Sequence, residues 1–197
     1  MEDIKDKQLK HLKKLSNLML LAGFLSSLFY SASYPYIYAE TIKVVNERYL
    51  SAEQIISCIG LIVFSALWNK YGDILFKHYV GIMVAEIIAD AILFGDVLIR
   101  ENLKFYFLFN VIIYSIITKN ICCGGIKMRA KVNPTEKLRE KYDNNMNICY
   151  ALSTLIGASV AIIVSLPLRL LFILALIGGV IDNIFYLYIF IQLKKAQ

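Results

Sequence analysis

Residues 168–192 read LRLLFILALIGGVIDNIFYLYIFIQ, an apolar run whose only charged residues are Arg169 and Asp182. About 20 such residues are enough for a helix to cross the hydrocarbon core of a bilayer. Comparable apolar segments lie upstream, at 15–38, 53–68, 75–98, 105–126 and 146–166. The sequence therefore predicts an all-α membrane protein in which residues 1–197 form a single domain of six transmembrane helices.

The overall composition agrees with a lipid environment. Hydrophobic residues make up 58% of the chain and charged residues 18%, whereas about a quarter of the residues in a soluble domain are charged. A net charge of +6 could indicate nucleic-acid binding in a soluble protein. No basic stripe interleaved with aromatic residues is present here, so we predict no nucleic-acid partner.

The cysteines and histidines do not form a recognisable metal or disulfide pattern. The four cysteines lie in or beside apolar segments, at Cys58, Cys122, Cys123 and Cys149. No C-x-x-C occurs, and His11 and His78 stand in basic flanks. We expect buried, unmodified thiols and predict no metal, no cofactor and no catalytic residue.

The distribution of lysine and arginine predicts the orientation of the spans. One side of the predicted bundle has only Lys43, Arg48, Arg100, Lys104 and Arg169, and Lys119 lies within a span. The other basic residues all fall on the side that holds both termini. By the positive-inside rule both termini are cytoplasmic, in a multi-pass protein of the cell membrane.

The longest predicted cytoplasmic loop covers about residues 127–145. Within it, Pro134 and Thr135 suit the start of a short interfacial helix through Leu138 and Tyr142. A solvated connector without fixed structure is the alternative.

Residues 65–73, SALWNKYGD, follow the second predicted helix. They resemble the G-x-L-x-D-R-x-G-R-R signature of the major facilitator superfamily at the same loop. Leu67, Lys70 and Gly72 match it, while Ser65, Asn69 and Asp73 replace its first Gly, its Asp and a basic residue.

A second stretch adds to this resemblance. Pro134, Glu136 and Arg139 look like the P-x-E-x-x-R run that leads into the fifth helix of many facilitators. Gly157 and its neighbours then provide the small residues that let helices approach closely in lipid. The resemblance covers about residues 15–192.

The resemblance carries several expectations about assembly and gating. It implies one half of a twelve-helix transporter, because facilitators consist of two six-helix halves. We therefore expect a homodimer, or a heterodimer with another six-helix chain. The resemblance also implies a cytoplasmic gate formed by Asn69, Lys70, Gly72 and Arg129.

Ionisable residues within the spans are the main functional signal, because each is costly at the bilayer centre unless paired or hydrated. Glu86 and Asp90 are four residues apart and share a helix face. We predict that they carry protons. Asp182, Lys119 and Asn110 also lie within spans and are predicted to contact a substrate. The alternative is that Glu86 or Asp182 only pairs with Lys119 and braces the helices.

The first predicted helix carries aromatic residues in its outer half. Tyr30, Tyr34 and Tyr38 recur every four residues, and Pro35 should kink the helix. Tyr30 and Tyr34 could stack a planar or amphipathic substrate. An interfacial tyrosine belt is the alternative.

The leading interpretation is a non-enzymatic, half-size transporter that moves a small organic or amphipathic solute, with proton coupling, as a dimer. A second is the substrate-binding subunit of an energy-coupling-factor importer, which would need an ATPase partner. A third is a membrane immunity or assembly protein without transport. Intramembrane peptidase chemistry by Cys58 and His78 lacks an activating third group.

Overall fold

A computed structural model describes residues 2–45, 47–100, 109, 114–164 and 166–195, and the side chains of 8–45, 51–95, 109, 116–164 and 166–195. This part of the chain forms six α-helices and one π-helix and contains no strand. The elements are α1 (Glu2–Val44), α2 (Glu47–Lys77), α3 (Tyr79–Arg100), η1 (Tyr114–Thr118), α5 (Lys119–Val132), α6 (Glu136–Ile163) and α7 (Leu168–Lys195). The prediction of an all-helical protein is confirmed.

Four helices in the described residues are long and apolar enough to cross a membrane: Gln8–Val44, Ser51–Lys77, Glu136–Ile163 and Leu168–Lys195. The predicted span at 75–98 corresponds to α3. The predicted span at 105–126 lies partly outside the described residues, and its remaining part is η1 and the first half of α5. Six spans therefore stay a prediction.

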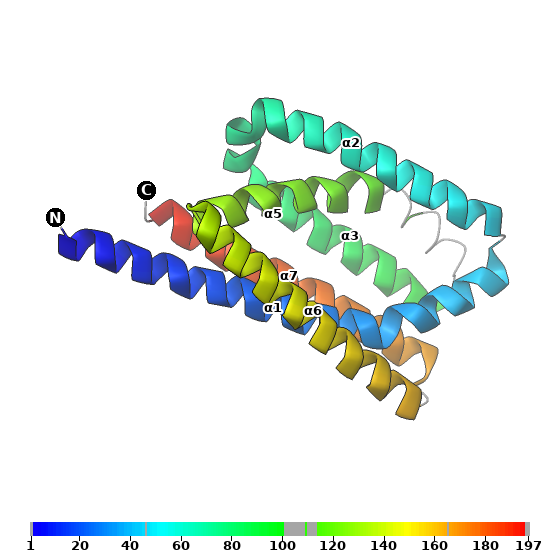
Figure 1. Ribbon diagram of the computed structural model, residues 1–197. Helices are drawn as coiled ribbons and strands as arrows, with labels where there is room; N and C mark the ends of the chain where they lie inside the picture. Colours follow the sequence, from blue (N-terminus) through cyan, green and yellow to red (C-terminus); the bar gives the residue numbers. More distant parts are fainter. Residues whose placement is uncertain (1, 46, 101–108, 110–113, 165, 196–197) are drawn as a thin grey trace.

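The helices pack in two groups that α3 connects (Figure 1). α1 lies against α6 and α7, whereas α2 lies against α5 and η1. α3 packs mainly on α7 and also contacts α5. α1 therefore packs mainly against the last two helices, and not against α2, its neighbour in the sequence.

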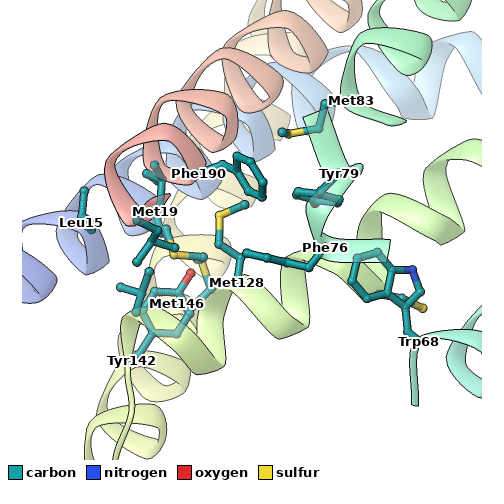
Figure 2. Close-up of a cluster of buried hydrophobic side chains, with 14 residues drawn as sticks. Leu15, Met19, Trp68, Phe76, Tyr79, Met83, Met128, Tyr142, Met146 and Phe190 are labelled. Atoms are coloured by element: carbon teal, nitrogen blue, oxygen red, sulfur yellow. The ribbon is translucent and has the colours of Figure 1, made fainter. Parts of the chain in front are cut away.

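Two clusters of buried apolar side chains mark the two ends of the bundle. Figure 2 shows the larger one, to which the first part of α1 contributes Leu15 and Met19 and the end of α7 contributes Phe190. The end of α5 contributes Met128 and the start of α6 contributes Tyr142. The smaller cluster joins the other ends of the helices through Ile37, Leu93, Phe94, Leu171, Phe172 and Ala175. Successive described helices thus alternate in direction, and α1 begins at the end where α7 finishes.

Glycines set the closest helix crossings. A Cβ atom at Gly157 of α6 would lie 2.6 Å from the carbonyl oxygen of Leu28, so the backbones of α1 and α6 touch. At Gly178 of α7 a Cβ atom would lie 3.1 Å from the Cβ of Phe29. The expected close approach at Gly157 is confirmed, as is usual for small residues between membrane helices.

The predicted loop at 127–145 is wrong. α5 continues to Val132, and only Asn133, Pro134 and Thr135 separate it from α6. The Thr135 hydroxyl caps α6 by accepting from the Leu138 N–H at 3.4 Å, in agreement with the predicted helix start. The helix is not short, because it continues to Ile163. The charged residues near this turn therefore belong to the end of α5 and the start of α6, and not to a loop.

The turn is anchored to α1. Asn133 is buried, its side-chain oxygen accepts from the Ser16 hydroxyl at 3.0 Å, and its amide group donates to the Arg129 carbonyl. The guanidinium of Arg139 donates to the carbonyls of Asn133 and Pro134. These bonds satisfy the backbone of the turn and fix α1, α5 and α6 relative to one another.

Candidate functional site: a carboxylate cluster inside the bundle

Glu86 lies in the middle of α3 and is buried. Its Oε1 accepts a hydrogen bond from the Thr118 hydroxyl at 3.0 Å, and the buried Asn183 of α7, whose amide donates to the Gly179 carbonyl at 3.1 Å, lies nearby. Thr118 is the last residue of the π-helix η1, and a π-turn in an otherwise α-helical chain often occurs at functional positions. Glu86 is thus bound by a neutral donor from η1 and faces a neutral amide of α7.

Asp90 lies one turn further along α3 and faces the backbone of α7. A Cβ atom at Gly179 would be 3.1 Å from the Asp90 Oδ2 and 2.9 Å from the Tyr30 hydroxyl. Both polar groups therefore rest on the same glycine. Because Gly179 has no side chain, the Tyr30 hydroxyl of α1 and the Asp90 carboxylate of α3 can meet at α7.

Asp182 provides the third carboxylate, one turn after Gly179 on α7. The buried Ser26 hydroxyl of α1 lies close to it. The charge of Glu86 acts on both Asp90 and Asp182. We call this group the carboxylate site; its members are Ser26, Tyr30, Glu86, Asp90, Thr118, Gly179, Asp182 and Asn183.

The arrangement has a clear chemical consequence. Like charges placed together away from bulk water repel strongly, and an ionised carboxylate at membrane depth is costly. Hydroxyl and amide donors reduce this cost but add no positive charge. A site of this kind can hold protons or attract a cation.

The aromatic residues of α1 divide between two roles. The rings of Tyr30 and Tyr34 lie edge to face with centroids 5.1 Å apart, and both are half-buried. Tyr38 is exposed. Tyr36, which is outside the predicted stripe, donates to the Ala161 carbonyl at 3.0 Å and joins α1 to α6. Tyr30 is the member of the stripe that reaches the carboxylate site.

Two other predicted substrate residues have different positions. Lys119 directly follows Thr118, begins α5 and is half-buried. Asn110 lies outside the described residues. Pro35 stands within α1, which stays one helix and changes direction in its last part (Figure 1).

The predicted cytoplasmic gate contains a helix kink and two ion pairs. Tyr71 interrupts α2 with φ −119° and ψ 17°. Asn69 and Lys70 just before it are exposed, and the Lys70 ammonium lies 5.0 Å from the centre of the Tyr71 ring. Gly72 is buried against the Lys127 side chain.

The ion pairs at this end of the bundle involve residues other than Asn69. Asp73 pairs with Lys127 at 2.7 Å, which joins α2 to α5. Arg129 pairs with Asp143 at 3.0 Å, which joins α5 to α6. The facilitator signature has a basic residue at the position of Asp73 and an acidic residue at the position of Asn69. In this chain the acidic residue is therefore four positions later than in the signature.

The cysteines correct one expectation. Cys123 is buried and its sulfur lies 3.7 Å from the Ser65 hydroxyl, but Cys58 and Cys122 are exposed and Cys149 is half-buried. All four are free thiols. Among the described side chains, no group of three or more His, Cys, Asp or Glu is arranged to hold a metal ion.

Sequence reasoning missed part of the carboxylate site. Glu86 and Asp90 follow from their spacing, but Ser26, Thr118 and Gly179 gave no separate signal. The Gly178-Gly179 pair close to Asp182 and Asn183 is the feature that could have indicated a crowded polar crossing on the last helix. A scan against protein-family models, a search of curated proteins and a search of solved structures each gave no match to this chain. The function is therefore argued from the chemistry of the site.

Proposed function

We propose that this chain is a multi-pass membrane transport subunit, with both termini in the cytoplasm, that moves a small organic or amphipathic solute and uses the carboxylate site to carry protons. The observation that supports this proposal is the convergence of Glu86, Asp90 and Asp182 from two helices inside an apolar bundle. A proton carrier needs carboxyl groups that can gain and lose a proton at membrane depth.

The partners of these carboxyl groups support exchange of protons over static bracing. Thr118 donates a hydrogen bond to Glu86, Asn183 lies beside Glu86, and Ser26 lies beside Asp182. These neutral partners can hydrogen-bond to a carboxylate and to a carboxylic acid, because a hydroxyl or amide both donates and accepts. The site can thus keep its geometry while its protonation changes.

The order of helix packing supports the facilitator-like half. α1 packs on α6 and α7, whereas η1 with α5, the predicted fourth span, packs on α2 and α3. The third and last spans, α3 and α7, pack on each other. If the first span is exchanged with the fourth, the second with the fifth and the third with the sixth, this set of contacts stays the same. A repeat of three plus three helices is a property of each facilitator half.

The outer face of α2 is open for a second chain. Ile55, Ile59 and Ile62 along this helix are exposed. In a half-size transporter this face would meet a second six-helix unit, so we propose that the active form is a dimer, either of two identical chains or with a related chain.

The test uses proteoliposomes that contain the full chain and the pH dye pyranine. A panel of amphipathic amines, acids and neutral solutes is added outside, and the proposal expects that one class produces an internal pH change. Glu86→Gln should abolish this change, while Glu140→Gln, which alters an exposed carboxylate of α6, should preserve it. If the unaltered chain transports a solute into the proteoliposomes without any change of internal pH, the proposed proton coupling is contradicted.

A further inference from the structure

Lysine side chains gather around one carboxylate where α2 and α5 end. The Lys127 ammonium pairs with Asp73 at 2.7 Å, and the charges of Lys131 and Lys77 also act on the Asp73 carboxylate. Lys77 is the last residue of α2, and Lys131 lies in the last turn of α5. Asp73 and Lys77 are four residues apart on α2, and Lys127 and Lys131 are four residues apart on α5, so the two further lysines lie one turn beyond the ion pair on the same helix faces.

Aromatic rings hold part of this group in place. The Lys131 ammonium lies 5.1 Å from the centre of the Phe76 ring. Phe76 contacts Phe190 of α7 with ring centroids 4.9 Å apart, and Lys194 lies 4.9 Å from the Phe190 ring. Cation–π contacts of this kind favour an ammonium over a ring face. The positive charge is therefore positioned on a buried aromatic pair rather than spread over free side chains.

The charge of this corner is not balanced within the group. Asp73 is 88% exposed, and one carboxylate cannot neutralise three ammonium groups. Lysine in the last turn of a helix offsets the helix dipole, which applies to Lys77 and Lys131 but not to Lys127, one turn earlier on α5.

Apolar residues continue the same surface. Ile74 follows Asp73 and is 57% exposed, and Ile126 precedes Lys127 and is 56% exposed. A ligand that fits here would need a negative head for the lysines and an apolar body for the isoleucines. The membrane itself supplies such a molecule.

We propose that Lys77, Lys127 and Lys131 bind the phosphate headgroup of an anionic phospholipid, whose acyl chains lie along Ile74 and Ile126. This inference rests on the membrane location given under the proposed function and does not depend on transport. Basic pockets between membrane helices are a recurrent mode of anionic-lipid recognition.

Trp68 gives a direct measurement of this binding. It is the single tryptophan of the chain, lies on α2 five residues before Asp73 and donates from its indole N–H to Asn120 at 2.7 Å. The full chain is reconstituted in vesicles in which the phosphatidylcholine or the phosphatidylglycerol has brominated acyl chains. Bromine quenches Trp68 when the labelled lipid lies beside it, so the two titrations give the relative affinity for each headgroup.

The proposal expects stronger quenching by brominated phosphatidylglycerol. In the double variant Lys77→Gln, Lys131→Gln this preference should fall by about fivefold for each lysine removed. The matched control is Lys137→Gln, Lys141→Gln, which removes the same charge from exposed positions of α6 and should keep the preference.

Each other outcome is decisive. Equal quenching by both lipids, or an equal loss in the two double variants, would overturn the site and leave only diffuse surface charge. Quenching by brominated phosphatidylcholine that equals that of the unaltered chain shows that Trp68 of a variant keeps its buried position, since unfolding would expose it and raise the quenching. Absence of quenching by either lipid in the unaltered chain would overturn the lipid site but not the membrane location, because Trp68 is 7% exposed and only a lipid held beside α2 would reach it.

Discussion

The ammonium of Lys127 crosses the backbone of Gly72 to pair with the carboxylate of Asp73. A Cβ atom at Gly72 would lie only 2.8 Å from the Lys127 Nζ, and the ion pair itself measures 2.7 Å. The pair joins the end of α2, just after the kink at Tyr71, to α5. It is a direct link between the two helices on the side of the bundle where α1 begins.

This link leads to the first prediction. Asp73→Asn should loosen the contact of α5 with α2, whereas Asn69→Asp should have a smaller effect because Asn69 is exposed and Arg129 already pairs with Asp143. The measurement is the rate of maleimide labelling of a single cysteine introduced at Ser65, in a chain without the four natural cysteines. Faster labelling in Asn69→Asp than in Asp73→Asn would assign the gate to Asn69 instead.

The second prediction concerns the bond between Thr118 and Glu86. Thr118→Val keeps the shape of the side chain but removes the donor at 3.0 Å from Glu86. Interhelical hydrogen bonds in membranes contribute about 0.6 kcal/mol on average, so stability should fall only slightly. Proton movement should shift to a different pH range because the carboxylate loses a stabilising partner. Thr154→Val on α6 is the control, and an identical pH profile in Thr118→Val would contradict a role for this bond.

The third prediction separates a brace from a proton carrier. Glu86→Gln keeps a group that can bond to Thr118 and Asn183, so the melting temperature should change little while solute-driven proton movement disappears. If Glu86 instead braces the bundle through Lys119, Glu86→Gln should lower the melting temperature and Lys119→Met should partly restore it. Melting curves of the two single variants and the double variant decide between the two roles.

The fourth prediction concerns the crossing of α1 and α6. A methyl group at Gly157 would meet the Leu28 carbonyl oxygen at 2.6 Å and the Ala32 nitrogen at 3.1 Å. Backbone atoms cannot move aside as a side chain can, so Gly157→Ala should cost about 1–3 kcal/mol. Gly81→Ala is the control, because nothing lies within 4 Å of its Cβ position. When unfolding is measured in mixed detergent micelles, Gly157→Ala should have a lower free energy of unfolding than the unaltered chain, and Gly81→Ala should not.

A fifth prediction uses the glycine of the carboxylate site. At Gly179 the atoms that a methyl group would meet are the ends of side chains, the Tyr30 hydroxyl and the Asp90 Oδ2. Gly179→Ala should therefore destabilise the protein less than Gly157→Ala but displace these two groups. We expect reduced proton movement with a nearly normal melting curve, and the reverse pattern would place Gly179 among purely structural residues.

Sequence reasoning was most successful where the signal is local. Apolar runs predicted the helices because lipid selects their length and composition. The spacing of Glu86 and Asp90 predicted a common face. The joining of Asp182 to that face depends on how α3 packs on α7, and no pattern along one helix contains that information.

The two regions that resembled facilitator motifs show why other expectations differed. The signature indicated Asn69 as a gating residue, which stays a prediction, and the structure adds an ion pair one turn later, at Asp73 and Lys127. The charged stretch at 127–145 looked like a loop because its residues are polar. Helices that project beyond the apolar region carry the same composition, and Asn133, Pro134 and Thr135 alone make the turn.

The packing of α1 against α6 and α7 also affects how the protein is made. A ribosome releases the first helix well before the last two exist, because chains emerge from their N-terminus at a limited rate. Until then the partner surfaces of Ser26, Tyr30 and Leu28 have no helix to rest on. The bundle around α1 can therefore be completed only after translation of α7.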